Sequence, residues 1–150
     1  SRSGLSNVHP ARIEHERDTK IKRLAGKADR VLVDAPCSGL GTLRRNPDLK
    51  WRQSEASVAE LTQKQAAILE AAARLLKPGG RLVYATCSLL AAEHAALVQG
   101  FLAANVGFRL LPASEILGRQ GVEIEGEMLR LLPHRQATDG FFAAALERVA

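Results

Sequence analysis

Two runs of β-forming residues, each followed by a turn that bears a cysteine, flank one long helical pattern. The first run is Arg30-Val31-Leu32-Val33-Asp34, and it leads into Pro36-Cys37-Ser38-Gly39. From Ser54 to Leu76 apolar residues recur at helical spacing, with Ser54 placed to cap the start. Lys77-Pro78-Gly79-Gly80 is expected to stop this helix, and Arg81 to Thr86 forms the second β-rich run. The order strand, helix, strand predicts two parallel strands joined by a right-handed crossover.

The rest of the chain extends this pattern. We expect a helix from about Ala91 to Ala104, a third strand at Phe108 to Leu111, and a closing antiparallel pair formed by Glu127 to Leu132 and Phe141 to Arg148. Asn7 to Ile13 is a candidate edge strand in spite of its proline, followed by a charged connection. A length of 150 residues fits one domain. The alternation of elements predicts an α/β fold whose sheet is mainly parallel, with a closing antiparallel hairpin.

Composition excludes several classes of protein. Hydrophobic residues make up 46% of the chain and charged residues 25%, which are values of a folded domain rather than of a disordered or fibrous chain. The apolar stretches are too short to span a bilayer and the first residues lack a signal-peptide pattern, so we expect a cytoplasmic protein. Cys37 and Cys87 are expected to stay reduced, and the histidines show no metal-ligand spacing with them.

The net charge of +5 is unevenly distributed along the chain. Residues 1–52 hold 12 Lys and Arg against 6 Asp and Glu, whereas the remainder is nearly neutral. A concentrated basic surface suits a polyanionic partner such as a nucleic acid, because phosphate contacts release counterions. A solvated basic face without a partner explains the same pattern equally well.

Asp34, Cys37 and Cys87 occupy matching positions directly after the two predicted strands. Ligands of an open α/β sheet collect beyond the carboxyl ends of adjacent strands, so these side chains are expected to reach one substrate. A single cysteine at a strand end is usually a small buried hydrophobe. That interpretation weakens when two thiols and an acid fall at equivalent places.

Four blocks cover most of residues 30–142: Asp34-Ala-Pro-Cys-Ser-Gly39, Leu43-Arg-Arg-Asn-Pro-Asp-Leu-Lys-Trp51, Leu76-Lys-Pro-Gly-Gly-Arg-Leu-Val-Tyr-Ala-Thr-Cys-Ser88 and Asp139-Gly-Phe-Phe142. In this order and spacing they resemble the Sun or Fmu-type RNA cytosine 5-methyltransferases that modify small-subunit ribosomal RNA. The resemblance implies the C-terminal half of a Rossmann-like class I methyltransferase fold. It also implies S-adenosylmethionine as the cofactor and RNA, with 16S ribosomal RNA expected first, as the substrate.

The chemistry of this reaction explains a pair of thiols. Carbon 5 of cytosine is a poor nucleophile, so a thiolate must first add to carbon 6, and the thiolate must later be expelled. Chemistry alone leaves open which thiol attacks. The resemblance implies that Cys87 is the nucleophile, that Cys37 assists product release, and that Asp34 borders the methionine end of the cofactor beside Pro36. Asp34 also suits a hydrogen bond to ring nitrogen 3.

Further contacts are implied with less sequence support. Asp18 stands in an Asp-Thr-Lys setting that resembles an Asp-x-Arg cofactor contact of the family, and a solvated Asp is an equal alternative. Arg44, Arg45 and Lys50 suit contacts to RNA phosphates. Trp51 suits either base stacking or packing in the core, and its place before a helix slightly favours the core. Asp139-Gly-Phe-Phe142 is interpreted as a turn into a buried strand without a catalytic role.

The family's Gly-rich cofactor turn, which follows its first strand, has no counterpart in this sequence. We therefore expect residues 1–150 to form a partial methyltransferase domain with little activity alone. The strand ending at Asp34 would have an unpaired apolar edge, covered by the missing N-terminal half or by a second copy. The main alternative is a non-catalytic RNA-binding or interaction module. A cysteine hydrolase is a weaker one, because no histidine closely follows either cysteine.

Overall fold

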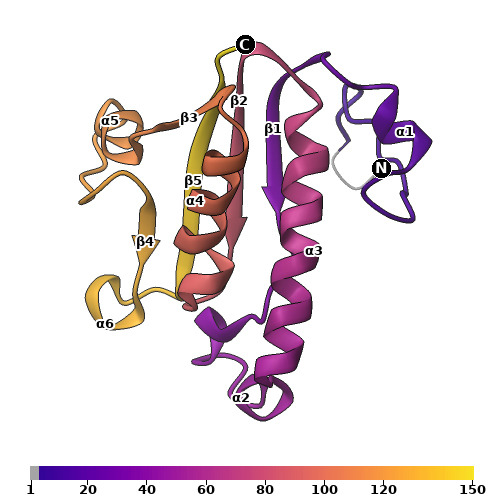
Figure 1. Ribbon diagram of the computed structural model, residues 1–150. Coiled ribbons are helices and arrows are strands. Elements are labelled where there is room, and N and C mark those ends of the chain that lie inside the picture. Colours follow the sequence, from indigo (N-terminus) through magenta and orange to yellow (C-terminus); the bar gives the residue numbers. More distant parts are fainter. Residues whose placement is uncertain (1–3) are drawn as a thin grey trace.

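The computed structural model describes residues 4–150 as a mixed sheet with helices packed on it (Figure 1). The sheet has five strands in the order β1-β2-β5-β3, and β4 also pairs with β5. The elements, in chain order, are α1 Thr19–Lys22, β1 Ala28–Asp34, the 3₁₀ helix η1 Leu40–Thr42, α2 Leu49–Arg52, α3 Glu55–Ala73, β2 Leu76–Thr86, the 3₁₀ helix η2 Ala91–Glu93, α4 Ala95–Ala104, β3 Phe108–Leu111, α5 Ala113–Gly118, β4 Leu129–Leu131, α6 Pro133–Gln136 and β5 Phe141–Arg148.

Four of these strands run in one direction and β5 opposes them. β1 pairs with β2 in parallel, and β5 is antiparallel to β2, β3 and β4. The predicted mainly parallel sheet and the antiparallel pairing of β4 with β5 are therefore confirmed. However, β5 does not close the sheet at its margin, because it lies between β2 on one side and β3 and β4 on the other.

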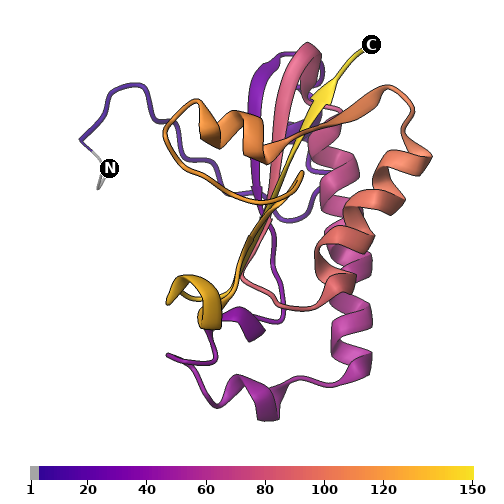
Figure 2. The same cartoon turned by 90° about the vertical axis from the view of Figure 1, so that its left-hand side faces the viewer.

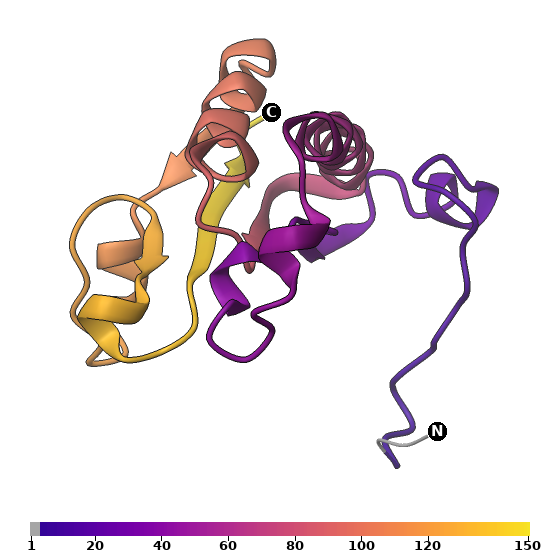
Figure 3. The same cartoon turned by 90° about the horizontal axis from the view of Figure 1, so that it is seen from below.

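Helices α3 and α4 cover one face of the sheet (Figures 2 and 3). Alternate residues of β1, β2 and β5 point toward them, because side chains along a strand alternate between its two faces. The core between these layers consists of buried apolar residues, among them Val33, Leu69, Leu76, Leu82, Tyr84, Val98, Phe101, Phe142, Ala144 and Leu146. This packing positions the carboxyl ends of β1 and β2 side by side.

The predicted helix α3 begins as expected and ends early. Ser54 caps it through a reciprocal pair of hydrogen bonds with Ser57, which satisfies amide groups of the first turn. The helix stops at Ala73, and β2 begins at Leu76. The expectation that Lys77-Pro78-Gly79-Gly80 only terminates the helix was wrong, since this segment lies within β2 where its register with β1 is irregular.

Two other expectations were also wrong. Residues 7–13 form no strand, because Pro10 lacks an amide donor and no strand of the described chain pairs with this segment. The predicted helix from Ala91 to Ala104 is broken into η2 and α4 at His94, whose backbone leaves the helical region at φ −134° and ψ −95°. The imidazole Nδ1 of His94 accepts a hydrogen bond from the amide of Ala95 and so caps α4.

β1 is an edge strand within residues 4–150, with β2 as its single neighbour. On the face turned away from α3, the side chain of Leu32 is 71% exposed. Strand edges and exposed apolar faces are sites where other chain segments pair and pack. The expected open edge is therefore present. Among the helices of the described chain, none combines the length and apolarity that a bilayer crossing requires.

Candidate active site

Cys37 and Cys87 meet beyond the carboxyl ends of the two parallel strands. Their Sγ atoms are 3.4 Å apart, a hydrogen-bonding contact that is much longer than the roughly 2.05 Å of a disulfide bond. The loop after β1 is also joined to β2 through the backbone, since the amide of Ala35 donates to the carbonyl of Ala85 at 3.0 Å. The predicted proximity of the two thiols is thus observed.

The surroundings of Cys37 change the acidity of its thiol. Burial, followed by the contact with Cys87, raises the pKa of the Cys37 thiol to about 12. Cys37 therefore remains protonated at neutral pH, and its S–H can donate to the sulfur of Cys87. Either sulfur can be the donor in the contact between the two thiols.

Glu93 lies beneath the thiol loops and was not identified from the sequence. Its side chain is completely buried, and it accepts hydrogen bonds from Ser38 and Ser88, the residues that directly follow the two cysteines. Gln65 of α3 donates a further hydrogen bond to it at 2.9 Å. Burial alone would raise the pKa of Glu93, but the hydrogen bonds from Ser38 and Ser88 hold that pKa below its usual range. In the sequence Glu93 is one acidic residue within a mainly apolar helical pattern, and nothing in that pattern indicated that it would bond to the thiol loops.

Gly41 joins the thiol loops to the start of β5. Its amide donates to the carbonyl of Cys87 at 2.9 Å, and its carbonyl accepts from the amide of Gly140 at 2.7 Å. A Cβ atom on Gly41 would lie 2.2 Å from the Gly140 oxygen, so only glycine fits. The segment Asp139-Gly140 leads directly into β5 at Phe141, and Gly140 supports the Cys87 loop through Gly41.

Asp34 and Pro36 are exposed at the end of β1. Within residues 4–150 the Asp34 carboxylate has no hydrogen-bond or ion-pair partner. It therefore presents an unneutralised negative charge beside the open edge of the sheet, which suits a cationic group.

Residues 4–147 match the model of the 16S rRNA methyltransferase RsmB/F family. The chain belongs to this family. It is 48% identical over 122 residues to a Synechocystis protein described as "Probable ribosomal RNA small subunit methyltransferase B", covering 80% of this chain and 27% of that protein. It is 45% identical over 120 residues to ribosomal RNA small subunit methyltransferase B of Serratia proteamaculans, and the match covers 79% of this chain and 26% of that protein.

Solved structures agree with this membership. PH0851 superimposes with a TM-score of 0.86 at 39% identity, covering 98% of this chain and 32% of PH0851. NSun6 from Pyrococcus horikoshii, determined with SFG, gives a TM-score of 0.79 at 30% identity, and the match covers 99% of this chain and 36% of NSun6. The sheet is consequently part of a Rossmann-like methyltransferase fold. The chain spans about a quarter of the length of these RsmB/F relatives and about a third of the solved structures.

Asp18 is not brought to the thiols. Its carboxylate caps α1 by accepting from the amide of Lys20 at 2.9 Å. α1 lies to the side of the start of β1, whereas the thiols lie beyond the other end of that strand (Figure 1). The structure therefore assigns Asp18 a local capping contact, and its contact with a cofactor stays a prediction.

The basic residues near the thiol loops have different environments. Arg45 forms an ion pair with Asp139, and Arg44 donates to the carbonyl of Ala137 at 3.2 Å. Both therefore help to join the Cys37 loop to the segment before β5. Lys50 lies over the Trp51 ring, 4.8 Å from its centroid. Trp51 is 80% exposed, so the expectation that it packs in the core was wrong, since α2 turns this ring to the surface.

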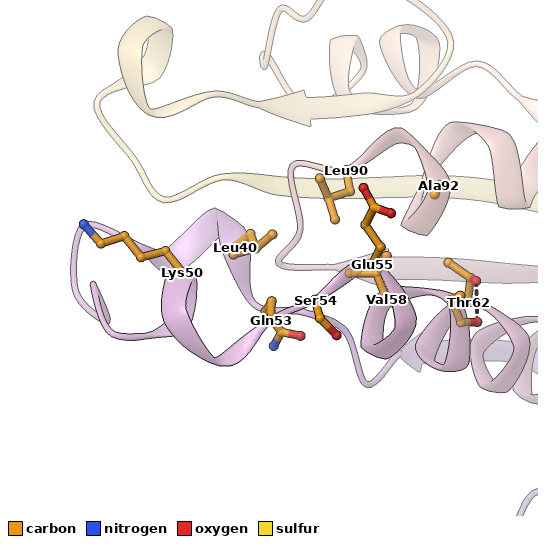
Figure 4. Close-up of a pocket in the computed structure, with 10 residues that line it drawn as sticks. Leu40, Lys50, Gln53, Ser54, Glu55, Val58, Thr62, Leu90 and Ala92 are labelled. Atoms are coloured by element: carbon orange, nitrogen blue, oxygen red, sulfur yellow. Dashed lines mark hydrogen bonds between the residues drawn. The ribbon is translucent and has the colours of Figure 1, made fainter.

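A groove of about 770 Å³ adjoins the Cys37 loop without including either thiol. It runs between Leu40, the first turns of α3 and the Leu90 segment, and Glu55 extends from α3 toward Leu90 (Figure 4). Gln53 at its margin donates to the carbonyl of Ser38 at 3.0 Å, so the wall of the groove and the thiol loop are connected.

Proposed function

We propose that this chain carries the catalytic thiols of an RNA methyltransferase that adds a methyl group to carbon 5 of cytosine. The observation that carries the proposal is the 3.4 Å contact between Cys37 and Cys87 at the ends of neighbouring parallel strands, in a member of the RsmB/F family. Small-subunit ribosomal RNA is the proposed substrate, because the relatives from Synechocystis and Serratia are described as acting on it.

Cys87 is the proposed nucleophile. Its sulfur adds to carbon 6 of the target cytosine, which makes carbon 5 electron-rich. The half-buried, protonated Cys37 supports this assignment, because a thiol of raised pKa is a poor nucleophile at neutral pH and a suitable hydrogen-bond donor. Asp34 is the proposed hydrogen-bond partner of nitrogen 3 of the ring, a contact that stabilises the adduct.

Cys37 is the proposed release group. Once carbon 5 carries the new methyl group, its remaining proton passes to a base and the bond between carbon 6 and the Cys87 sulfur breaks. An S–H donor 3.4 Å from that sulfur stabilises the thiolate as it departs. The two thiols therefore have opposite roles, one forming the covalent bond and the other assisting its cleavage.

The proposed methyl donor is S-adenosylmethionine, since NSun6 was determined with its analogue SFG. When bound, this cofactor supplies an electrophilic methyl group on a positively charged sulfur. The unpartnered carboxylate of Asp34 and the adjacent Pro36 fit the cationic methionine end of such a group. We propose that the rest of its binding site lies outside this chain, on a segment or second copy that also covers β1 and Leu32.

RNA is proposed to approach over the exposed Lys50 and Trp51. An exposed aromatic ring stacks on unpaired bases, and a lysine beside it contacts phosphate. Arg44 and Arg45 keep exposed side chains in spite of their protein contacts, so they remain candidate phosphate ligands.

The test is covalent trapping in a chimera. The matching segment of the Synechocystis relative is replaced by this chain, and the protein is incubated with S-adenosylmethionine and RNA that contains 5-fluorocytosine. Fluorine cannot leave carbon 5 as a proton does, so the adduct accumulates. Peptide mass spectrometry should place the RNA on Cys87, in native and Cys37→Ser chimeras alike, and Cys87→Ser should give none.

The controls separate the alternatives. The isolated chain should give no adduct, as expected if its cofactor site is incomplete. An adduct on Cys37 would reverse the assigned roles. RNA binding without an adduct in any chimera would favour a non-catalytic RNA-binding module. Light scattering measures the oligomeric state and so tests whether a second copy of the chain covers β1. A monodisperse monomer would contradict coverage by a second copy.

A further inference from the structure

The buried carboxylate of Glu93 links the two thiol loops through their serines. Its Oε2 accepts from the hydroxyl of Ser38 and from the hydroxyl of Ser88, each at 2.5 Å. Its Oε1 accepts from the amide of Ser38 at 2.8 Å and from Gln65 at 2.9 Å. Four donors compensate a charge whose burial would otherwise be strongly unfavourable.

Each serine connects the carboxylate to its own loop in the same way. The Ser38 oxygen accepts from the amide of Leu40 at 3.5 Å, and the Ser88 oxygen accepts from the amide of Leu90 at 3.0 Å. Each hydroxyl proton is directed to Glu93. The hydroxyls of Ser38 and Ser88 also lie 3.3 Å from each other. Among the other residues of the range 4–150, Glu93 alone has a side chain that forms hydrogen bonds with both serines.

The position of Glu93 is itself held firmly. Its carbonyl accepts a hydrogen bond at 2.9 Å from the hydroxyl of Tyr84, a completely buried residue of β2. The break in the helix at His94 separates η2 from α4, so Glu93 ends a short helical turn instead of lying within a continuous helix. Gln65, which bonds to Glu93, also donates to the carbonyl of Pro36 at 2.8 Å.

The charge of Glu93 does not explain its place near a nucleophile. A negative charge close to a thiol opposes formation of the thiolate. Glu93 forms no hydrogen bond with either sulfur, so it neither donates nor accepts a proton there. Its contribution must therefore be geometric.

We propose that Glu93 is a positioning residue that holds the loops after β1 and β2 in one register, so that the sulfurs of Cys37 and Cys87 stay in contact. The geometric part depends only on the structure, and its catalytic consequence rests on the proposed function. Small displacements of reacting groups by about 1 Å can change rates by roughly a hundredfold. Loss of the Glu93 contacts should therefore separate the thiols enough to slow any reaction that needs both.

The first test measures the thiol pair without RNA or cofactor. The full 150-residue chain is treated with diamide, which takes up the two hydrogens as the thiols form a disulfide, and mass spectrometry follows the loss of two mass units. Glu93→Ala should slow this intramolecular oxidation by about tenfold or more at a temperature where circular dichroism shows the variant folded. An unchanged rate would overturn the proposal.

Two conservative variants separate geometry from charge. Glu93→Gln keeps the length of the side chain and one carbonyl oxygen that can accept both serine hydroxyls. Its NH₂ group replaces the oxygen that accepts from the Ser38 amide and from Gln65, so the recovery it gives is partial. Glu93→Asp keeps the charge but is one methylene too short to reach them. Positioning predicts faster oxidation in the Gln variant than in the Asp variant, and the reverse order would contradict it.

Val98→Ala is the matched control for lost stability. Val98 is a completely buried apolar core residue of α4 whose side chain forms no hydrogen bond, so its truncation should lower the melting temperature and leave the oxidation rate unchanged. An oxidation rate that falls in Val98→Ala as much as in Glu93→Ala would reduce Glu93 to a stability role and overturn the proposal.

The same Glu93 variants in the chimera give the catalytic readout. Glu93→Ala should lower the rate of adduct formation on Cys87 by a factor similar to that for diamide oxidation, with partial recovery in Glu93→Gln. Slower oxidation with no adduct in any chimera would support positioning and contradict the proposed function. If Glu93→Ala shows a normal oxidation rate and normal adduct formation, the proposed function is supported and the positioning role of Glu93 is contradicted.

Discussion

Replacing Gly41 by alanine should disrupt the support of the Cys87 loop. A Cβ at this position would lie 2.2 Å from the carbonyl oxygen of Gly140 and 2.7 Å from that of Cys87. Both are backbone atoms, which cannot rotate away as a flexible side chain can. Gly41 is outside the left-handed backbone region, so the constraint is space and not φ.

The size of the effect follows from these contacts. A methyl group at 2.2 Å from an oxygen forces the strand start or the loop to move by about 1 Å. That shift weakens the 2.9 Å bond from Gly41 to Cys87 and the 2.7 Å bond from Gly140 to Gly41. Two such hydrogen bonds contribute about 1–3 kcal/mol and overpacking costs about 1–3 kcal/mol, so unfolding should become easier by roughly 2–6 kcal/mol.

Urea denaturation followed by circular dichroism measures this change, with Gly100→Ala as the control. Gly100 lies in α4 with open space around it, so the same substitution should stabilise the chain by about 0.5–1 kcal/mol. The two variants should therefore shift the midpoint in opposite directions. A Gly41→Ala free energy of unfolding within about 0.5 kcal/mol of the native value would refute the close-packing argument.

Three further outcomes can be measured. Because the folded state lowers the pKa of Glu93 from its ordinary 4.5, its contribution to stability is present above about that pH and is lost as the pH falls through the folded-state pKa. From about pH 6 to about pH 3, the urea midpoint of Glu93→Gln should thus fall less than that of the native chain, and equal losses would contradict this. With its pKa raised to about 12, Cys37 should react with iodoacetamide at about pH 8 at least tenfold more slowly than N-acetylcysteine, as peptide mass spectrometry would show. Trp51→Ala should change the free energy of unfolding by less than about 0.5 kcal/mol yet weaken single-stranded RNA binding about tenfold in fluorescence anisotropy, with Trp51→Phe largely retaining it.

The thiol site combines parts that differ greatly in sequence separation. Cys37 and Cys87 are 50 positions apart, and Gly140 follows Cys87 by more than 50 further residues, yet all belong to one hydrogen-bonded group. Substitutions remote from the sulfurs should therefore alter their reactivity through the loops, as the Gly41 and Glu93 variants are designed to show.

The local sequence was sufficient for the strand at β1, for α3 with its Ser54 cap and for the meeting of the two thiols. Strand and helix periodicity depend on neighbouring residues, and the carboxyl ends of parallel strands meet at one edge whatever the remaining fold. Cys37 and Cys87 could thus be placed together from the order of strand, helix and strand alone.

Tertiary structure decided the rest. The position of β5 between β2 and β3, the inclusion of Lys77–Gly80 in β2 and the exposure of Trp51 depend on which segments pair and pack over long distances, and a periodic pattern contains no information about partners. The same holds for Glu93 and for the Arg45 to Asp139 ion pair. A buried carboxylate is tolerated only where folded loops bring enough donors to it, so its role becomes visible only once those loops have been assembled.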